Sequence, residues 1–462
     1  MEVFLAPAPA ATSDRLAANP NGMPDAEPAP ILPRQPRTVR DTGLEPRFLG
    51  ALVVKVLHAG GKTPLSLLTG RLRLSISVLR EVLQGLIAGQ QVEVAWSGES
   101  DIDVHYQLTA FGQRAAADHL AESRYVGPAP VTLATYRSMV ERQSLRQPGA
   151  ARVTPAELQA ALAPDGIEPG VRDLIGAALY SNRPLILYGP SGSGKTTLAR
   201  KLARLRQEAV AIPCAVLVNH EIVQVYDPAL HPAPPPQLRA MEERRSCDTR
   251  WALCQRPCVQ VGAELARDML ELRADPASGV LRAPPHLLAN NGLLVFDDLG
   301  RQRMPVAEVL DRWLGALESG ADQVAVPGGA AHALPFDAAL VLATSLAPEA
   351  VLDESCLRRI GYRIPVGPLS DSGYRALLRR QCRLSGIDAD ESAIDYLVDE
   401  LHQRTRRPLL AAWPQELVGR IVDFAGFAGH APRFDAASVA RAWSSLFGQD
   451  AALKPSTLGD ER

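Results

Sequence analysis

The residues with the most specific chemistry form one run, Gly189-Pro190-Ser191-Gly192-Ser193-Gly194-Lys195-Thr196, followed by Thr197. The run matches the pattern G-x-x-x-x-G-K-[ST], in which glycines let backbone N–H groups curl toward phosphate. It lies between an apolar segment, residues 185–188, and a helix-like segment, residues 197–202, whose N-terminus would add donors and a positive dipole. The pattern predicts that Lys195 reaches the outer phosphates of a nucleoside triphosphate and that the Thr196 hydroxyl sits on Mg²⁺. A glycine-rich turn without a ligand is the alternative.

Two adjacent carboxylates, Asp297 and Asp298, follow a second apolar run at residues 292–296. Such a run predicts a buried parallel strand, and open α/β sheets bind ligands at the C-terminal ends of their strands. We expect Asp297 to hold Mg²⁺ through water and Asp298 to orient or deprotonate the water that attacks the phosphate. The alternative is a strand that ends in an Asx turn without a catalytic role.

Two further pairs of polar residues are candidates for catalysis. Thr344 and Ser345 end a third apolar run, residues 339–343, where a hydroxyl can contact the γ-phosphate or the water. Ser and Thr also end strands for no chemical reason. Arg358 and Arg359 are adjacent at the end of a predicted helix, where they either complement the helix dipole or supply an arginine finger to a neighbouring subunit.

Bulk composition excludes several classes of protein. The chain has 462 residues, of which 46% are hydrophobic and 22% charged, with a formal net charge of -2. These values are ordinary for a globular protein of two or three domains and give no overall preference for a polyanion. Six cysteines are too few for a disulfide scaffold, and Cys247, Cys254 and Cys258 lack the spacing of a zinc site, which favours free thiols in a reducing compartment. Without a signal-peptide pattern or a membrane-length apolar run, we expect a cytoplasmic protein.

Composition and periodicity divide the chain into six segments. They are a disordered Pro/Ala-rich arm (1–44), a compact α+β unit (45–124), a linker with one helix (125–152), a nucleotide-binding core (153–368), a helical lid (369–447) and a flexible tail (448–462). Within the core, we expect a second strand at residues 214–218, a third helix around residues 262–272 and hairpin-like material at residues 272–284.

The unit at residues 45–124 has the helix–helix–helix–strand–strand order of a winged helix, which raises the question of DNA binding. Its charge argues against that function, because eight basic residues are balanced by eight acidic ones, and the third helix carries only Arg80 against Glu81. Neutralisation of phosphate supplies most nonspecific DNA affinity, and a neutral helix lacks it. The unit is therefore predicted to dock a protein.

This ordered set of motifs resembles the AAA+ ATPases over about residues 153–445. The matching segments are the Walker A motif (189–196), the Walker B motif (293–298), sensor 1 (343–345) and the arginine-finger segment (357–360). The resemblance implies an α/β fold, an AAA+ P-loop core with a parallel sheet and a C-terminal helical lid, here preceded by a winged-helix-like α+β domain. It also implies ATP and Mg²⁺ as ligands and a homo-oligomer, a hexameric ring, with sites between subunits.

A narrower resemblance comes from residues 295–303, 357–360 and 125–130, which are similar to a bacterial AAA+ group described as associated with Flp pilus assembly. Three positions depart from the AAA+ pattern. Asp298 stands where Glu is usual, Ser345 or Thr344 stands where sensor 1 is commonly Asn, and Gln415 stands where a lid arginine, sensor 2, is expected. Arg420 and Arg407 are weaker candidates for that arginine.

Three functions are consistent with these observations. The first is a ring-forming ATPase that remodels a protein client, and one candidate for the client is a pilus-assembly component. The second is an ATP-dependent regulator that binds DNA through the winged helix. The third is a scaffold that binds ATP without hydrolysing it, an alternative that the residues at 298 and 415 leave open.

Overall fold

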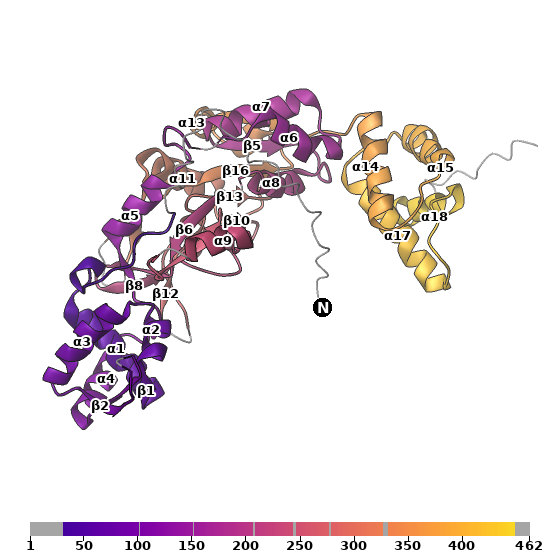
Figure 1. The fold of residues 1–462 in the computed structure, drawn as a ribbon. Helices are drawn as coiled ribbons and strands as arrows, with labels where there is room; N and C mark the ends of the chain where they lie inside the picture. The colour runs from indigo at the N-terminus through magenta and orange to yellow at the C-terminus, as the bar shows by residue number, and fades with distance from the viewer. Residues whose placement is uncertain are drawn as a thin grey trace, which may run out of the picture.

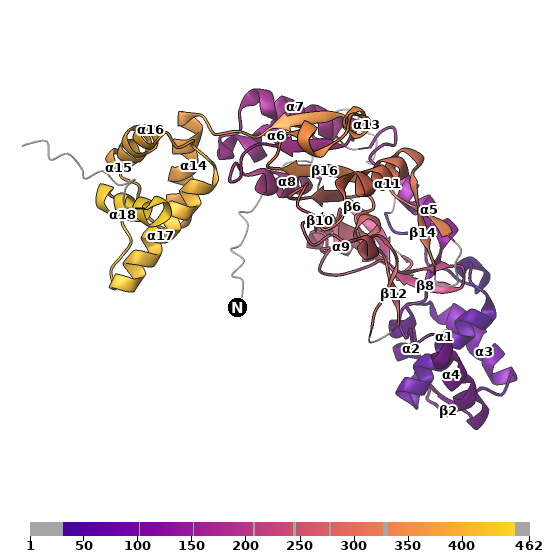
Figure 2. The ribbon, with the colours of Figure 1, turned by 180° about the vertical axis from the view of Figure 1, so that it is seen from behind.

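The structure is a computed structural model that describes residues 31–100, 102–150, 152–206, 208–243, 246–276, 279–326 and 331–448. Figure 1 shows three parts in a row, with the N-terminal unit in indigo at one end, the core in the middle and the C-terminal helices in yellow at the other end. Figure 2 shows the same order from behind. The expected tail and most of the expected arm lie outside the described residues.

The core is built on a five-stranded parallel sheet with the order β10-β13-β16-β5-β17. Its strands are β10 (Cys258–Val261), β13 (Leu293–Phe296), β16 (Ala339–Thr344), β5 (Leu185–Tyr188) and β17 (Tyr362–Pro365). The three central strands are apolar throughout because helices cover both faces of the sheet.

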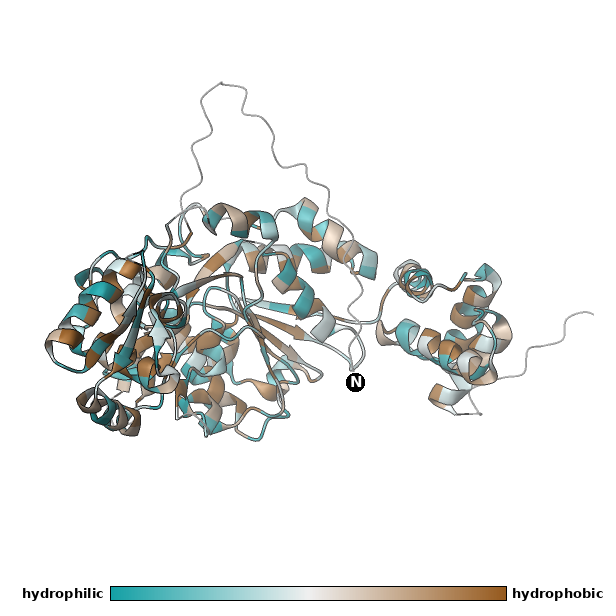
Figure 3. Ribbon diagram, turned by 60° about the horizontal axis from the view of Figure 1, so that its bottom comes forward, coloured by the Kyte–Doolittle hydropathy of each residue, from teal (hydrophilic) through white to brown (hydrophobic). Residues whose placement is uncertain are grey.

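Successive residues of the central strands face opposite sides, so they enter two separate hydrophobic clusters. One face packs against α6 (Pro155–Leu162), α7 (Pro169–Ser181) and α8 (Lys195–Arg204). The other face packs against α11 (Val306–Ser319), where the Trp313 ring contacts Phe296 of β13. Helix α5 (Leu133–Arg142) belongs to the same hydrophobic cluster but packs mainly on strands outside this sheet. Brown strands inside helices with teal outer faces show this layering in Figure 3.

A second five-stranded sheet, of order β11-β12-β8-β7-β4, lies beside the core. Its strands are β4 (Val131–Thr132), β7 (Ala215–Val218), β8 (Glu221–Gln224), β11 (Arg273–Ala274) and β12 (Leu281–Arg282). The strand expected at residues 214–218 therefore exists but belongs to this sheet, and the second strand of the central sheet is β10. Two antiparallel pairs, β6 (Ala209–Pro213) with β9 (Trp251–Gln255) and β14 (Ala321–Ala325) with β15 (Ala331–Pro335), complete the described strands of the core.

The prediction of a helix around residues 262–272 was wrong. Only a short 3-10 turn, Arg267–Leu270, forms there, with Leu270 as its single buried residue, and buried Leu265 lies before the turn, so the segment has no helical apolar stripe. The hairpin-like material that follows is the antiparallel pair of β11 and β12.

The N-terminal unit runs from α1 (Pro46–Gly60) to α4 (Ala110–Glu122). Between them lie β1 (Thr63–Pro64), α2 (Leu65–Leu72), α3 (Ile76–Ala88), β2 (Val92–Ser97) and β3 (Val104–Leu108). Ser75 caps α3 by accepting a hydrogen bond from the Val78 N–H. Its hydrophobic cluster continues into Ala215 and Ile222 of the second sheet, so the unit shares buried surface with the core.

The disordered arm was expected to extend to residue 44, but residues 31–44 are packed against folded parts of the chain. Arg34 forms an isolated bridge with Cys247, and Gln35 N–H donates to the Ser246 carbonyl. Ser75 Oγ donates to the Pro36 carbonyl at 2.7 Å, and Val39 N–H donates to Glu81 at 2.8 Å. These hydrogen bonds and the burial of Val39 offset the ordering entropy that a composition argument assigns to this segment.

The expected linker at residues 125–152 is likewise corrected, since it contributes to the core. β4 pairs in parallel with β7, and α5 buries Tyr136, Met139 and Val140 in the hydrophobic cluster of the core, where it packs on β4, β7 and β15. The single helix expected within this stretch is α5.

The C-terminal unit, called the lid below, contains four main helices around one cluster. They are α14 (Asp371–Leu384), α15 (Glu391–Asp395) continued by a π-helical stretch (Tyr396–His402), α17 (Ala412–Ala428) and α18 (Ala436–Phe447). Tyr374 and Trp443 are fully buried at its centre. No helix in the described part of the chain is both long enough and apolar enough to span a bilayer.

Candidate nucleotide site

The glycine-rich loop lies between β5 and α8 and requires glycine at three positions. Gly189, Gly192 and Gly194 have φ values of 143°, 83° and 93°, a region that side chains disfavour. The Lys195 ammonium donates to the Gly189 and Pro190 carbonyls, both at 2.9 Å, so it lies back along the loop. The curl predicted from the sequence is therefore formed.

The loop contains a buried polar group without a partner. Ser193 is 2% exposed, and its Oγ has no hydrogen-bond partner within the described part of the chain. Burying a hydroxyl in this way costs free energy unless a ligand satisfies it. The loop residues from Ser191 to Thr197 line a cavity of about 420 Å³, so a bound anion would meet Ser193 and the loop amides together.

Burial lowers the pKa of the Lys195 ammonium, and the nearby carboxylates of Asp297 and Asp298 oppose part of that effect. A desolvated ammonium favours an anionic ligand, whereas the two carboxylates would repel one. A divalent metal bound with the anion would neutralise the charge of the carboxylates, so the site suits a polyanion that binds together with a divalent metal.

The Thr196 hydroxyl and the Asp297 carboxylate meet although they are 101 positions apart, with Thr196 Oγ1 donating to Asp297 Oδ1 at 3.1 Å. The other oxygen of Asp297 accepts from Gln260 Nε2 at 2.9 Å, and Gln260 in turn accepts from Arg200 Nε at 3.0 Å. A hydroxyl and a carboxylate are hard oxygen donors of the kind that Mg²⁺ uses beside substrate phosphates. The donor set therefore fits Mg²⁺ at this point.

Asp298 follows in a left-handed conformation, with φ of 50°. The Gln302 side chain closes the turn by donating to the Asp297 and Asp298 carbonyls, at 3.2 and 2.9 Å, and by accepting from Gly300 N–H. Asp298 is exposed and lines the cavity. Its carboxylate faces the same space as the loop.

The two hydroxyl residues at the end of β16, Thr344 and Ser345, lie in different surroundings. Ser345 lines the cavity. Thr344 is 1% exposed, and its hydroxyl donates to the Leu299 carbonyl at 2.8 Å and accepts from Leu346 N–H. Thr344 thus holds the turn after β13 against β16, and of the pair only Ser345 faces the cavity.

Neither of the two adjacent arginines lines the cavity of its own chain. Arg358, on α13 (Glu354–Arg359), donates to Glu354 at 2.6 Å and is mostly exposed. Arg359 Nε lies 3.5 Å from Glu318 of α11. The structure does not bring them to the phosphate loop within one chain.

The lid closes one side of the cavity. Leu377, Gln381 and Leu384 of α14 line it, together with Gln415 at the start of α17. The Ala412 N–H donates to the Gly192 carbonyl at 3.0 Å, so the lid contacts the phosphate loop directly. A side chain on Gly192 or Gly194 would meet Ala412 or Ala411 at 3.4 Å.

Gln415 occupies the cavity position at which a lid arginine was expected. The two weaker candidates are elsewhere, since Arg420 pairs with Glu416 at 2.6 Å and the Arg407 guanidinium lies 4.0 Å from the Phe447 ring centroid. Sequence reasoning missed Gln260, Asp165, Lys201 and Arg380 as residues of this site. Gln260 carried little signal in the sequence, because its strand β10 has only four residues, one of them a cysteine, and lies beside the paired acids only through pairing with β13.

Residues 370–445, which make up the lid, match a family described as a domain of unknown function (DUF8689). No curated protein matches the chain. Among solved structures, the chain is similar to a point mutant of RuvB from Thermotoga maritima, at 17% identity and a TM-score of 0.37, over 62% of this chain and 72% of that one. It is also similar to NtrX from Brucella abortus in complex with ADP, at 16% identity and a TM-score of 0.36, over 71% of this chain and 58% of that one.

The class of protein follows from the chain's own strand order. The loop strand β5 lies between β16 and β17, the paired acids follow β13, and a helical unit comes after β17. This order, with the phosphate loop at the end of β5, is that of the AAA+ P-loop fold, which confirms the expected α/β class. The family match given above covers only the lid, and that family is described as a domain of unknown function.

Proposed function

We propose that this protein binds ATP with Mg²⁺ and hydrolyses it to ADP and phosphate. The observation that supports the proposal is the hydrogen bond between Thr196 and Asp297, two oxygen donors of the kind that Mg²⁺ uses, beside a phosphate loop with an unsatisfied buried hydroxyl. We also propose a cytoplasmic location, in which ATP and Mg²⁺ are available to the site.

The roles of the residues follow from their positions. The loop amides and Lys195 would bind the phosphates, and Thr196 and Asp297 would hold Mg²⁺, which would stabilise negative charge on the phosphate oxygens. Asp298 accepts a proton from the attacking water or orients it, and Ser345 contacts the water or the γ-phosphate. Gln260 fixes the Asp297 carboxylate so that one oxygen stays directed at Thr196.

Lys195→Ala tests the proposal, with phosphate release from ATP as the measurement. We expect phosphate release by the wild type to require Mg²⁺ and to be reduced at least a hundredfold in the variant, because removing one donor that stabilises transition-state charge typically costs about 3 kcal/mol or more. Lys62→Ala, at an exposed position in the N-terminal unit, is the matched control and should release phosphate at the wild-type rate. A wild type that binds ATP without releasing phosphate would replace the ATPase by the nucleotide-binding scaffold.

We further propose a ring, hexameric in the simplest case, in which Arg359 or Arg358 completes the site of the next subunit. The support is that both guanidinium groups lie on α13, outside the cavity of their own chain, and are at least one third exposed. The test is the ATPase rate per chain against protein concentration. Wild-type activity should rise with concentration, and Arg359→Ala should remove the rise; a rate independent of concentration in both proteins contradicts the ring.

The partner of the N-terminal unit is proposed to be a protein client rather than DNA, and the resemblance to the pilus-associated group makes a pilus-assembly component one candidate. The start of α3, the helix that would enter a DNA groove, is covered by residues 36–39 of the same chain. Val94 and Trp96 of β2 are instead 50% and 45% exposed. Salt-sensitive retardation of duplex DNA in a gel would overturn the assignment.

A further inference from the structure

We propose that Asp165 and Arg380 form an ionic latch that holds the lid on the core at the nucleoside end of the cavity, and that this latch sets the affinity for nucleotide. The inference rests on the proposed ATP site and names the residues through which the lid acts on it. It assigns a role to an arginine that is distinct from the expected lid position, now occupied by Gln415.

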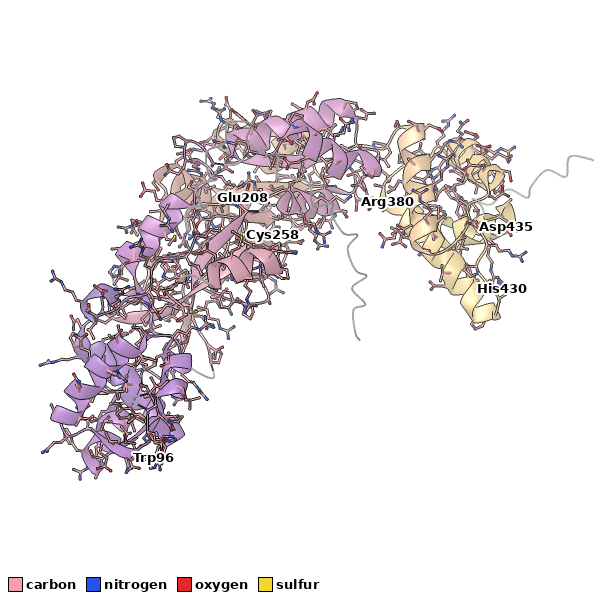
Figure 4. All side chains as sticks on the ribbon, viewed as in Figure 1. Trp96, Glu208, Cys258, Arg380, His430 and Asp435 are labelled. Carbon is pink, nitrogen blue, oxygen red and sulfur yellow. The ribbon has the colours of Figure 1, made fainter. Side chains whose placement is uncertain are left out.

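The latch is built around one carboxylate shared by two cations from different parts of the chain. Asp165 Oδ2 accepts from the Lys201 ammonium of α8, and Asp165 Oδ1 accepts from the Arg380 guanidinium of α14. The Asp165 side chain is only 18% exposed. Without the carboxylate, Lys201 and Arg380 would face each other as like charges across the core–lid boundary. Figure 4 shows Arg380 on the side of the lid that faces the core.

The position of Lys201 locates the latch along the cavity. Lys201 is six residues beyond Lys195 on α8, which corresponds to about 9 Å at the helical rise of 1.5 Å per residue. The latch therefore lines the same cavity as the phosphate loop but lies about 9 Å further along α8. Ile167, Leu377 and Leu384 supply apolar lining to the same cavity, as a base requires.

A backbone contact beside the latch restricts how the lid can move. Gly166 has φ of 72°, and a Cβ built on it would lie 2.8 Å from Gly373 Cα at the start of α14. A Cβ on Gly373 would lie 3.1 Å from Gly166 Cα. The backbone at Gly166 thus packs directly against the backbone at Gly373, with no side chain between the two segments. The glycine pair acts as a pivot, and Arg380, two turns further along α14, closes the lid onto Asp165.

Substitution of Arg380 tests the latch, with a fluorescent ATP analogue and Mg²⁺ as the probe. We expect Arg380→Ala to weaken nucleotide binding about tenfold, within the range of coupling between distinct sites, and Arg380→Lys to keep most of the affinity because the charge remains. Arg379→Ala is the matched control, since Arg379 is the neighbouring residue of α14, has the same 37% exposure and pairs with Glu391 inside the lid. Arg379→Ala should bind nucleotide as the wild type does.

Hydrogen exchange in the nucleotide-free protein gives a second readout, independent of the ATP site. The Ala412 amide, bound to the Gly192 carbonyl, is protected only while the lid is closed. Arg380→Ala should accelerate exchange in a peptide spanning residues 409–418 and leave a peptide from α18 unchanged, which also shows that the lid remains folded. Unchanged exchange, or unchanged affinity with faster exchange, overturns the proposal. If the wild type binds no nucleotide, the ATPase proposal fails while exchange still decides whether the latch exists.

Discussion

At residue 298, the backbone explains a departure from the usual pattern. The turn after β13 places Asp298 at φ of 50°, a conformation that Asp and Asn adopt far more readily than most side chains. A glutamate would have its carboxylate one methylene further out but would strain this turn. We infer that aspartate is the acid that this turn accommodates best at the position of the proposed catalytic group.

Asp298→Asn is therefore a clean test of the catalytic role, because Asn tolerates the same φ. Nucleotide affinity should stay within about threefold of wild type, and phosphate release should fall by about a hundredfold or more, the usual contribution of a general base. Both are measured on the same preparation, by fluorescence titration and by phosphate assay. A release rate within twofold of wild type would remove Asp298 from the mechanism.

A second residue-scale prediction concerns Gln260, whose side chain connects Arg200 to Asp297. Gln260→Leu keeps the volume but removes the hydrogen bond that orients the carboxylate. The Mg²⁺ concentration for half-maximal ATPase activity should rise about tenfold, as for other residues that orient metal ligands. Gln113→Leu, at an exposed position on α4, is the control. An unchanged Mg²⁺ dependence would limit Gln260 to a packing role.

At the scale of elements, sequence patterns predicted the apolar strands well and the short ones poorly. β5, β13 and β16 are apolar runs followed by the residues predicted for the site, so both the strands and the loop that follows β5 were identifiable. β10 contains a glutamine and a cysteine in only four residues, and its strand state depends on pairing with β13. Such pairing is a tertiary effect that local propensity does not contain.

The residues of the site follow the same division. Lys195, Thr196 and Asp297 belong to motifs with fixed spacing, and the sequence locates them directly. Asp165, Lys201 and Arg380 come from three separate elements that meet only when the lid docks. No spacing rule relates residues that are brought together in this way, so only the structure reveals them.

The lid contains a buried histidine that makes its stability depend on pH. His402 is 3% exposed. Its Nε2 lies 3.0 Å from the Tyr374 hydroxyl, with which it forms a hydrogen bond, and its Nδ1 lies 3.1 Å from the Arg407 carbonyl. Burial lowers the pKa of His402 from 6.5 to about 4. The unfolded chain therefore takes up a proton at a higher pH than the folded lid, and folding is favoured while His402 is neutral.

Stability of the lid should accordingly be full above pH 6.5, fall as the pH drops toward 4, and level off below that value. The lowered pKa corresponds to a loss of about 3 kcal/mol across this window. Urea unfolding at a series of pH values, followed by fluorescence of the lid tryptophans, measures it. His430→Gln, at an exposed position, should leave the profile unchanged, whereas a flat wild-type profile contradicts the assignment.

At the scale of the whole molecule, a buried ion pair of the core lies at the junction with the N-terminal unit. Asp248 and Arg250 are each 4% exposed and make a bidentate contact, with the shortest distance 2.8 Å. The same guanidinium donates to the Thr42 carbonyl at 3.4 Å and the Pro130 carbonyl at 3.2 Å. Those two carbonyls lie just before and just after the N-terminal unit, so Arg250 holds both connections.

Arg250→Ala should lower the free energy of unfolding by about 3–5 kcal/mol, because it leaves the Asp248 carboxylate buried without a partner. Arg404→Ala, which removes an exposed pair with Glu400, should cost less than about 1 kcal/mol. Urea unfolding compares the two variants. Limited proteolysis between residues 123 and 130 then reports whether the N-terminal unit has come loose, and resistance equal to wild type would contradict the role of Arg250 at this junction.

The clamp made by Arg250 also has a mechanical consequence. A unit held at both of its chain connections cannot swing on a flexible tether, so it moves with the core as a lever arm. Any small rotation of the core during a nucleotide cycle would become a larger displacement at Trp96, which Figure 4 places at the far end of the N-terminal unit. A client bound at that end would be pulled by each cycle and not merely retained.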